Sequence, residues 1–254
     1  MEWFVQFFGT GGARFVASRQ LRATGGLRLK YKSTNIYIDP GPGAIVRIRA
    51  AQESFDPAEL DAIILTHKHM DHSNDVNILI ESMAEGGFKK KGTLFTPQDA
   101  LNEDPVVFRF VRGYLDRIVA LTEAGRYSIK DVTFSTPVRH RHPVETYGLL
   151  FHLESTIGLI ADTRFFDELP DHYRADYLII NVLRSTPIEN HEIIDHLAVD
   201  DVRTIVNRVR PRAAILTHFG FKMVEEGPER IAERLSDETG IRVIAAYDGM
   251  KWEF

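Results

Sequence analysis

The stretch "LTHKHMDHSND" at residues 65–75 places three histidines and an aspartate within six consecutive positions. These four residues are His67, His69, Asp71 and His72. Residues 61–66 have the short apolar character of a buried strand, so the polar cluster is expected in the loop at that strand's carboxyl end. A lone histidine there would indicate an ordinary polar turn, but four candidate ligands together indicate a metal site.

The ligand types and their spacing predict two metals rather than one. Imidazole and carboxylate suit zinc, iron or manganese without any thiolate. The H-x-H-x-D-H spacing differs from the helical H-E-x-x-H pattern. From an extended loop His67 and His69 can point the same way, while Asp71 and His72 reach a second point nearby.

Composition indicates a globular chain that we expect to form one domain over residues 1–254. No Ser-rich, Pro-rich or charge-block linker divides the 254 residues. Hydrophobic residues make up 44% and charged residues 26%, which is ordinary for a soluble protein. The net charge of −5 argues against a dedicated nucleic-acid binder. The absence of cysteine excludes disulfides and thiolate metal sites.

The amino-terminal residues and the hydropathy pattern predict a cytoplasmic protein without a membrane span. The start "MEWFVQFFGTGG" lacks a basic region, and its apolar run is too short for a signal peptide. No stretch approaches the roughly 18 apolar residues that a transmembrane helix needs.

The order of the predicted elements favours an α/β fold. Strands are predicted at 3–8, 27–39, 93–96, 177–182, 213–217 and 242–247, with a strand-rich region over 117–161. Helices are predicted at 73–85, 104–115, 200–209 with Asp200 as its cap, and 226–237. The glycine loop 9–12 is expected to connect two strands directly, with no helix after it. This pattern predicts two packed sheets with helices outside, a four-layer αββα sandwich.

Further candidate ligands follow other apolar strands. They are His140 or His142 in "STPVRHRHPVETYG", Asp162 in "GLIADTRF" and His218 in "AAILTHFG". Each lies where a strand is expected to end, so all should reach the same edge of the sandwich as the first cluster.

With these motifs in this order, from the first strand to the last, the sequence closely resembles the metallo-β-lactamase superfamily. That family's motifs are the H-x-H-x-D-H loop, a further His, a bridging Asp and a final His. The resemblance implies one metal held by His67, His69 and His142, a second held by Asp71, His72 and His218, and Asp162 between them. Because "HPVETYGLLF" resembles the family's third-histidine segment, His142 is preferred, with His140 as its rival on the same face of a predicted strand.

Asp39 lies in "YIDPG", which also resembles the family. Its carboxylate could orient a ligand imidazole by accepting a hydrogen bond from the ring nitrogen that does not bind metal. Alternatively, it could only cap its own turn, and both interpretations stay open.

Within the superfamily the nearest resemblance is to the ribonuclease Z and phosphodiesterase branch. "FFGTGGARFVASRQLRATGGLRL" at 7–29 and "LTHFG" at 216–220 are similar to that branch. His196 in "DHLAVDDV" stands 22 residues before His218, in the place of the branch's Gly-His-Ser-Thr histidine. The branch's Glu-Ala-Thr element is replaced by Asn181 and Val182, which leaves the partner of His196 open.

The implied activity is hydrolysis at two divalent metals, with zinc first and manganese or iron as alternatives. Two such metals lower the pKa of a bridging water to about 7 and prepare in-line attack by the resulting hydroxide on a phosphodiester. Asp71 could accept the water's proton. His196 could donate a proton to the leaving oxygen, or it could stabilise the negative charge on the equatorial oxygens of the phosphoryl group.

The expected substrate is a small phosphodiester or cyclic nucleotide. Ribonuclease Z carries a long Gly/Pro-rich arm between its third His and its bridging Asp, whereas only 19 residues separate His142 from Asp162 here. The alternatives are ribonuclease Z-type RNA 3′ processing and a lactone or thioester hydrolase. Two alternatives from different functional classes also stay open: a mononuclear-iron dioxygenase and a non-catalytic ligand-binding regulator. The oligomeric state is not determined, and a homodimer stays open.

Overall fold

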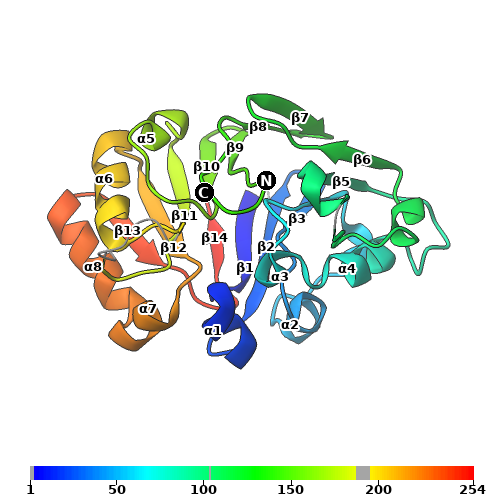
Figure 1. Cartoon of the computed structure of the whole chain (residues 1–254), viewed down its shortest axis with the longest axis horizontal. Helices are drawn as coiled ribbons and strands as arrows, with labels where there is room; N and C mark the ends of the chain where they lie inside the picture. The colour runs from blue at the N-terminus through cyan, green and yellow to red at the C-terminus, as the bar shows by residue number, and fades with distance from the viewer. Residues whose placement is uncertain (1–2, 103, 187–194) are drawn as a thin grey trace.

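The computed structural model describes residues 3–102, 104–186 and 195–254. Over these residues the strands form two seven-stranded sheets (Figure 1). The first sheet has the order β14-β1-β2-β3-β4-β5-β6. Its strands are β1 (Trp3–Gly9), β2 (Thr24–Tyr31), β3 (Thr34–Ile38), β4 (Ala62–Ile64), β5 (Thr93–Thr96), β6 (Arg117–Ala120) and β14 (Lys251–Glu253).

The second sheet has the order β13-β12-β11-β10-β9-β8-β7. Its strands are β7 (Gly125–Ile129), β8 (Val132–Thr136), β9 (Leu149–His152), β10 (Thr156–Ile160), β11 (Tyr177–Asn181), β12 (Ala213–Thr217) and β13 (Arg242–Ala245). The helices are α1 (Ala13–Arg19), α2 (Ala44–Ala50), α3 (Met70–Ser73), α4 (Val76–Met83), α5 (Leu169–His172), α6 (Val199–Val209), α7 (Phe221–Glu226) and α8 (Pro228–Thr239). Short 3₁₀ turns occupy Pro57–Glu59, Gln98–Ala100 and Val111–Tyr114.

Each sheet contains a parallel half. Strands β3 to β6 are parallel to one another, and so are β10 to β13. Parallel strands are covered on both faces, so they read as continuous apolar runs. The sequence "AAILT" of β12 is buried at every position, as this arrangement requires.

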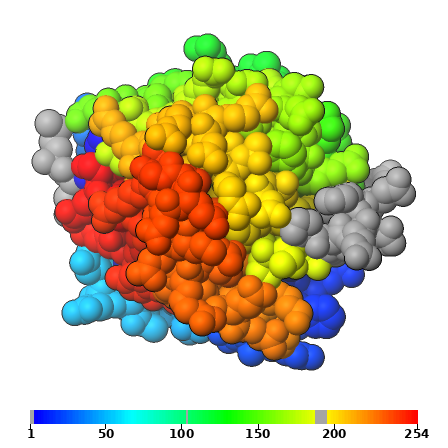
Figure 2. Space-filling view, turned by 90° about the vertical axis from the view of Figure 1, so that its left-hand side faces the viewer, coloured from blue at the N-terminus to red at the C-terminus, as the bar shows by residue number. Residues whose placement is uncertain are grey.

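Three apolar clusters hold the layers together. One lies between the sheets and includes Phe7, Ile36, Phe134 and Ile215. A second fills the space between the second sheet and helices α5, α6 and α8, and a third lies under α2 and α4 on the first sheet. Figure 2 shows α6 in yellow and α8 in red-orange spread over one outer face. The predicted four-layer αββα sandwich is confirmed.

Two predictions about helices were wrong. A helix, α1, does follow the glycine loop directly, because the carboxylate of Asp71 accepts a hydrogen bond from the amide of Ala13 at the helix start. Residues 104–115 are not an α-helix. There the side chain of Asn77 bonds the carbonyl of Val106 and the amide of Phe108, which replaces helical hydrogen bonds.

Two further helices differ from prediction at their starts. The predicted helix 73–85 is divided into α3 and α4, and α3 begins three residues before the predicted start, at Met70. Helix α6 is capped at Ala198 rather than Asp200, and Asp201 reaches back to accept a hydrogen bond from the amide of Ala198.

Within the described part of the chain, we find no helix with the length and apolar character needed to cross a bilayer.

Candidate metal centre

The four ligand candidates of the opening stretch lie between the end of β4 and the first turn of α3. His67 and His69 come from the extended segment, whereas Asp71 and His72 lie within α3. The change from extended to helical backbone divides the motif into two pairs that face different points.

The first group of nitrogen atoms comes from His67, His69 and His142. One ligand atom from each lies within 4.8 Å of the others. Nε2 of His142 is 3.0 Å from Nδ1 of His69, and its own Nδ1 is 2.9 Å from the carbonyl oxygen of Asp195. The Asp195 carbonyl selects the tautomer with a proton on Nδ1, which leaves the Nε2 lone pair directed at the group.

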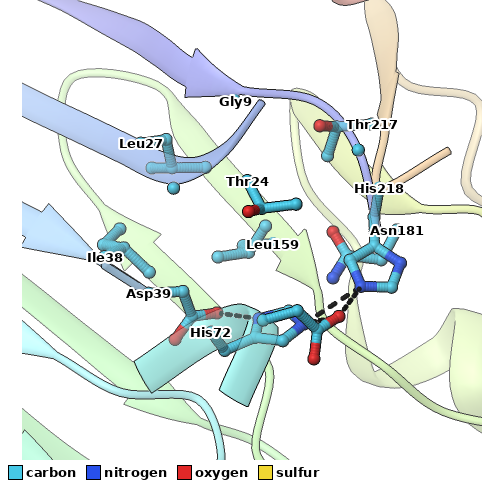
Figure 3. A pocket seen from close by; sticks show the side chains of 13 residues that line it. Gly9, Thr24, Leu27, Ile38, Asp39, His72, Leu159, Asn181, Thr217 and His218 are labelled. Atoms are coloured by element: carbon cyan, nitrogen blue, oxygen red, sulfur yellow. Dashed lines mark hydrogen bonds and ion pairs between the residues drawn. The ribbon is translucent and has the colours of Figure 1, made fainter. Parts of the chain in front are cut away.

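The second group comes from Asp71, His72 and His218, again with ligand atoms within 4.8 Å of one another. Nε2 of His218 lies 3.0 Å from Nε2 of His72 and 3.3 Å from Oδ2 of Asp71. Figure 3 shows the His72 and His218 rings turned toward each other at the edge of a small pocket.

Asp162 lies between the two groups. Its Oδ2 is 3.7 Å from Nε2 of His67 in the first group. It is 3.4 Å from Nε2 of both His72 and His218 in the second. Oδ2 of Asp162 therefore faces both groups.

The electrostatics of the cluster fit divalent cations. Burial, with the neighbouring His72, holds the pKa of His67 well below its usual value, and burial lowers the pKa of His69 to about 4. Against burial, His218, His196 and His72 hold the pKa of Asp162 well below the ordinary range. Neutral imidazoles and ionised carboxylates are the protonation states that bind metals.

His67 supplies a second indication of a metal. Its Nε2 is fully buried and has no hydrogen-bond partner among the residues that the structure describes. Buried polar nitrogen without a partner is costly, about 1–3 kcal/mol, and a cation at this point would remove that cost.

His72 has the opposite pKa shift. Burial alone would lower the pKa of His72. The nearby carboxylates of Asp71, Asp162 and Asp39 instead raise this pKa well above the ordinary value. A metal at this residue must displace the imidazolium proton, so metal binding here releases a proton.

Asp39 lies behind His72 and not only in its own turn. Its Oδ2 is 2.9 Å from Nδ1 of His72, and its two oxygens also accept hydrogen bonds from the amide and hydroxyl of Thr66. The structure thus favours the reading in which Asp39 orients an imidazole (Figure 3).

His140 points away from both groups. Its Nδ1 lies 3.2 Å from the carbonyl oxygen of Asp162 and its Nε2 lies 2.7 Å from the hydroxyl of Tyr173. The expectation that residues 140 and 142 share one face of a strand was wrong. The segment contains only an isolated bridge between Arg139 and Tyr147 and then bends.

His196 lies against the cluster. Its Nδ1 is 3.6 Å from Oδ2 of Asp162, and its ring centroid is 5.2 Å from that of His142 and 5.7 Å from that of His218. Burial lowers the pKa of His196 to about 4. Asp162 is thus an ion-pair neighbour of His196, and His142, Asp162 and His196 form a further group of side chains that could hold a metal.

The loops around the centre have strained backbone. Ala13, Asp39 and His218 have φ angles of 59°, 52° and 63°, in the left-handed region. Such conformations cost about 1–3 kcal/mol each and persist where the surroundings enforce them. Gly12 packs so closely on the ring of His218 that an added Cβ would lie 2.2 Å from Nδ1.

Sequence reasoning missed two polar contacts of the site. The amide of Ala13 donates to Oδ2 of Asp71 at 2.8 Å, and the amide of Asn181 donates to Oδ1 of Asp162 at 2.8 Å. In the first contact the donor is a backbone amide, so the residue type at position 13 leaves no mark in the sequence. The second had a signal, an asparagine at the end of a buried strand.

Comparisons with known proteins agree with this architecture. Residues 34–219 match the family model of the beta-lactamase superfamily domain. The chain is 31% identical over 258 residues to an uncharacterised protein of Methanocaldococcus jannaschii, MJ1374, which covers 97% of this chain and 93% of that protein. It is 31% identical over 112 residues to ribonuclease Z of Thermococcus kodakarensis, a match to 44% of this chain and 32% of that enzyme.

Solved structures show the same fold. The metallo-β-lactamase fold protein YhfI of Bacillus subtilis superposes with a TM-score of 0.81 at 20% identity, over 99% of both chains. A diphosphatase of the PhnP family superposes with a TM-score of 0.72 at 19% identity, over 100% of this chain and 98% of that one. The chain therefore belongs to the beta-lactamase superfamily and has the metallo-β-lactamase fold, and its relatives include ribonuclease Z.

Proposed function

We propose that this protein is a dinuclear metal-dependent phosphodiesterase that acts on a small phosphodiester or cyclic nucleotide. The observation that carries the proposal is the convergence of two three-residue ligand groups on one carboxylate, Asp162. A mononuclear centre, as in an iron dioxygenase, would not require the second group.

The proposed ligands divide as the two groups do. One metal would be held by His67, His69 and His142, the other by Asp71, His72 and His218, with Asp162 shared. Histidine and carboxylate favour zinc, and manganese and iron also fit this donor set. When bound, two such metals supply a water with a lowered pKa and neutralise charge on the phosphoryl oxygens.

Asp71 is suited to bind metal and to orient the attacking water as a hydrogen-bond acceptor, since a carboxylate of very low pKa is a weak base. Its pKa is held well below the ordinary value because His72 and His218 outweigh the effect of burial. The carboxylate is fixed by the amide of Ala13, so its direction does not depend on the substrate.

His196 is suited to act on the substrate without binding metal. With its pKa lowered to about 4, the imidazole is neutral at pH 7. A neutral ring has one N–H to donate, which favours a hydrogen bond to a charged phosphoryl oxygen over full proton transfer to the leaving group.

The compactness of the chain supports a small substrate. The interval between His142 and Asp162 is only 19 residues long and contains β9 and β10, so no RNA-gripping arm is placed there. The net charge of −5 also disfavours the many phosphate contacts that hold a folded RNA. The PhnP-family protein among the similar structures is, by its name, a diphosphatase.

RNA 3′ processing is the second candidate function. It is favoured by the sequence match to ribonuclease Z and by the structural likeness to the human short-form tRNase Z, with a TM-score of 0.67 at 16% identity. That match covers only 32% of the Thermococcus enzyme.

The test compares both substrates in one buffer with one metal. Wild-type protein should cleave bis(p-nitrophenyl) phosphate or a cyclic nucleotide, while precursor transfer RNA should not be trimmed accurately. His67→Ala should abolish turnover, and His152→Ala, at the exposed last position of strand β9, should retain it. Accurate 3′ processing of transfer RNA with little diester cleavage would replace this proposal with the ribonuclease Z activity.

Cytoplasmic location and a single domain over 1–254 rest on the sequence alone and stay predictions, and the possibility of a homodimer stays open.

A further inference from the structure

Asn181 is the last residue of β11 and lies behind the shared carboxylate of the candidate metal centre. Its side-chain nitrogen Nδ2 donates a hydrogen bond of 2.8 Å to Oδ1 of Asp162, and both residues are buried. A carboxylate group rotates readily about its terminal bond, because such torsions are broad and two-fold. The hydrogen bond from Asn181 removes that freedom.

The other carboxylate oxygen has different neighbours. Oδ2 of Asp162 lies 3.4 to 3.7 Å from ring nitrogens of four histidines. These are His67, His72, His196 and His218. The two oxygens of Asp162 thus have separate environments: Oδ1 meets a neutral amide, and Oδ2 faces these four imidazole rings.

The position of Asn181 is set by the same pair of strands that delivers a ligand. In the register of β11 and β12, Asn181 pairs with Thr217, the residue before His218. The amide of Val182 also donates to the carbonyl of Thr217 at 2.9 Å. Asn181 and His218 are therefore held in one rigid frame, on strands whose parallel ladder does not depend on metal.

The chemistry of the amide matters as well. An asparagine amide donates without carrying charge and without competing strongly for a divalent cation. A carboxylate at this place would add a negative charge and set an acceptor against Oδ1.

We propose that Asn181 is a positioning residue: by holding Oδ1 of Asp162 it keeps Oδ2 turned toward the two ligand groups, where this one carboxylate would serve both metal sites. The inference rests on the proposed dinuclear centre and deepens it. Without the amide, the carboxylate is free to turn and offer either or both oxygens to one metal, so the two sites lose their common ligand geometry.

The experiment uses Asn181→Leu and Asn181→Ala in the full chain. The matched control is Asn77→Leu, because the Asn77 amide also holds a distant segment through hydrogen bonds, to residues 106 and 108, and is not among the residues of the centre. Metal affinity is measured by competition with a chromogenic chelator, and coordination geometry by the visible absorption spectrum of the cobalt-substituted protein. Thermal unfolding of the metal-free variants shows whether each is folded.

We expect both Asn181 variants to bind at least one metal 10–100-fold more weakly, the usual loss for a residue that supports a metal ligand. Their cobalt spectra should change in band position or intensity, while the control keeps both properties. A folded Asn181 variant with wild-type affinity and an unchanged cobalt spectrum would overturn the inference.

These readouts do not involve substrate. If wild-type protein binds two metals but hydrolyses no phosphodiester, while the Asn181 variants still show the metal effects, the proposed activity fails and the inference stands.

Discussion

His72 turns one ring nitrogen to Asp39 and the other to the ligand cluster: Nδ1 lies 2.9 Å from Oδ2 of Asp39 and Nε2 lies 3.0 Å from Nε2 of His218. The carboxylate therefore holds the Nδ1 proton and leaves the Nε2 lone pair for a metal. This contact joins β3 to α3 behind the centre.

We predict that Asp39→Ala weakens metal binding about 10–100-fold, because His72 loses both its orientation and its tautomer preference. Asp176→Ala is the matched control, since Asp176 accepts hydrogen bonds from the amide and hydroxyl of Thr156 as Asp39 does from Thr66. Both variants should lose stability, by about 1–3 kcal/mol in urea unfolding. Equal metal affinity in the two variants would show that Asp39 has no role beyond its turn.

We predict two metals per chain. The stoichiometry is measured on the purified protein by inductively coupled plasma mass spectrometry. Each of His67→Ala and His218→Ala should lower the stoichiometry, because each removes a ligand from a different group. A stoichiometry near one that neither substitution changes would contradict the dinuclear centre.

Removal of metal by a chelator should lower the melting temperature, and added zinc should restore it. A ligand that binds only the folded chain stabilises it by about 2.7 kcal/mol at 100 times its Kd. Differential scanning calorimetry with and without chelator measures this difference. A melting temperature that is identical in the two conditions would mean that the centre is not loaded.

The third-histidine position separates His142 from His140. We predict that His142→Ala loses metal and turnover together, because its Nε2 lies beside His69. His140→Ala should retain both metals, since its ring nitrogens face Asp162's carbonyl and Tyr173. It should instead lower stability by roughly 1–3 kcal/mol through lost buried hydrogen bonds. Loss of metal in His140→Ala with a folded protein would reverse the assignment.

His196→Ala should keep both metals and lose about 10²–10³-fold in turnover, the usual loss when one hydrogen-bond donor to transition-state charge is removed. The reason is that its ring borders the cluster, 3.6 Å from Asp162, while seven other residues already fill the proposed ligand positions. Metal content and kcat are measured on the same preparation. Unchanged turnover would return His196 to a surface role.

Strand positions were the best predicted part of the fold. Strands 93–96 and 213–217 agree with β5 and β12 at both ends, because short apolar runs that are buried on both faces have few alternatives. Helices were predicted less well where side chains from elsewhere determine the backbone. Asn77 holds residues 106–108 out of a helix, and Asp71 caps α1 from 58 residues away.

By itself, the sequence determined the layered α/β fold and the types and order of the ligand candidates. The reason is that the periodicity of apolar residues and the spacing of polar ones are local properties of the chain. Only the tertiary structure decided that His140 turns to Tyr173, that His196 meets Asp162, and that Asn181 holds the oxygen of Asp162 that faces away from the cluster. These directions arise in loops and strand ends, where no regular period sets the side chain. There the nearest hydrogen-bonding partner, brought from a distant segment by packing, determines where each group points.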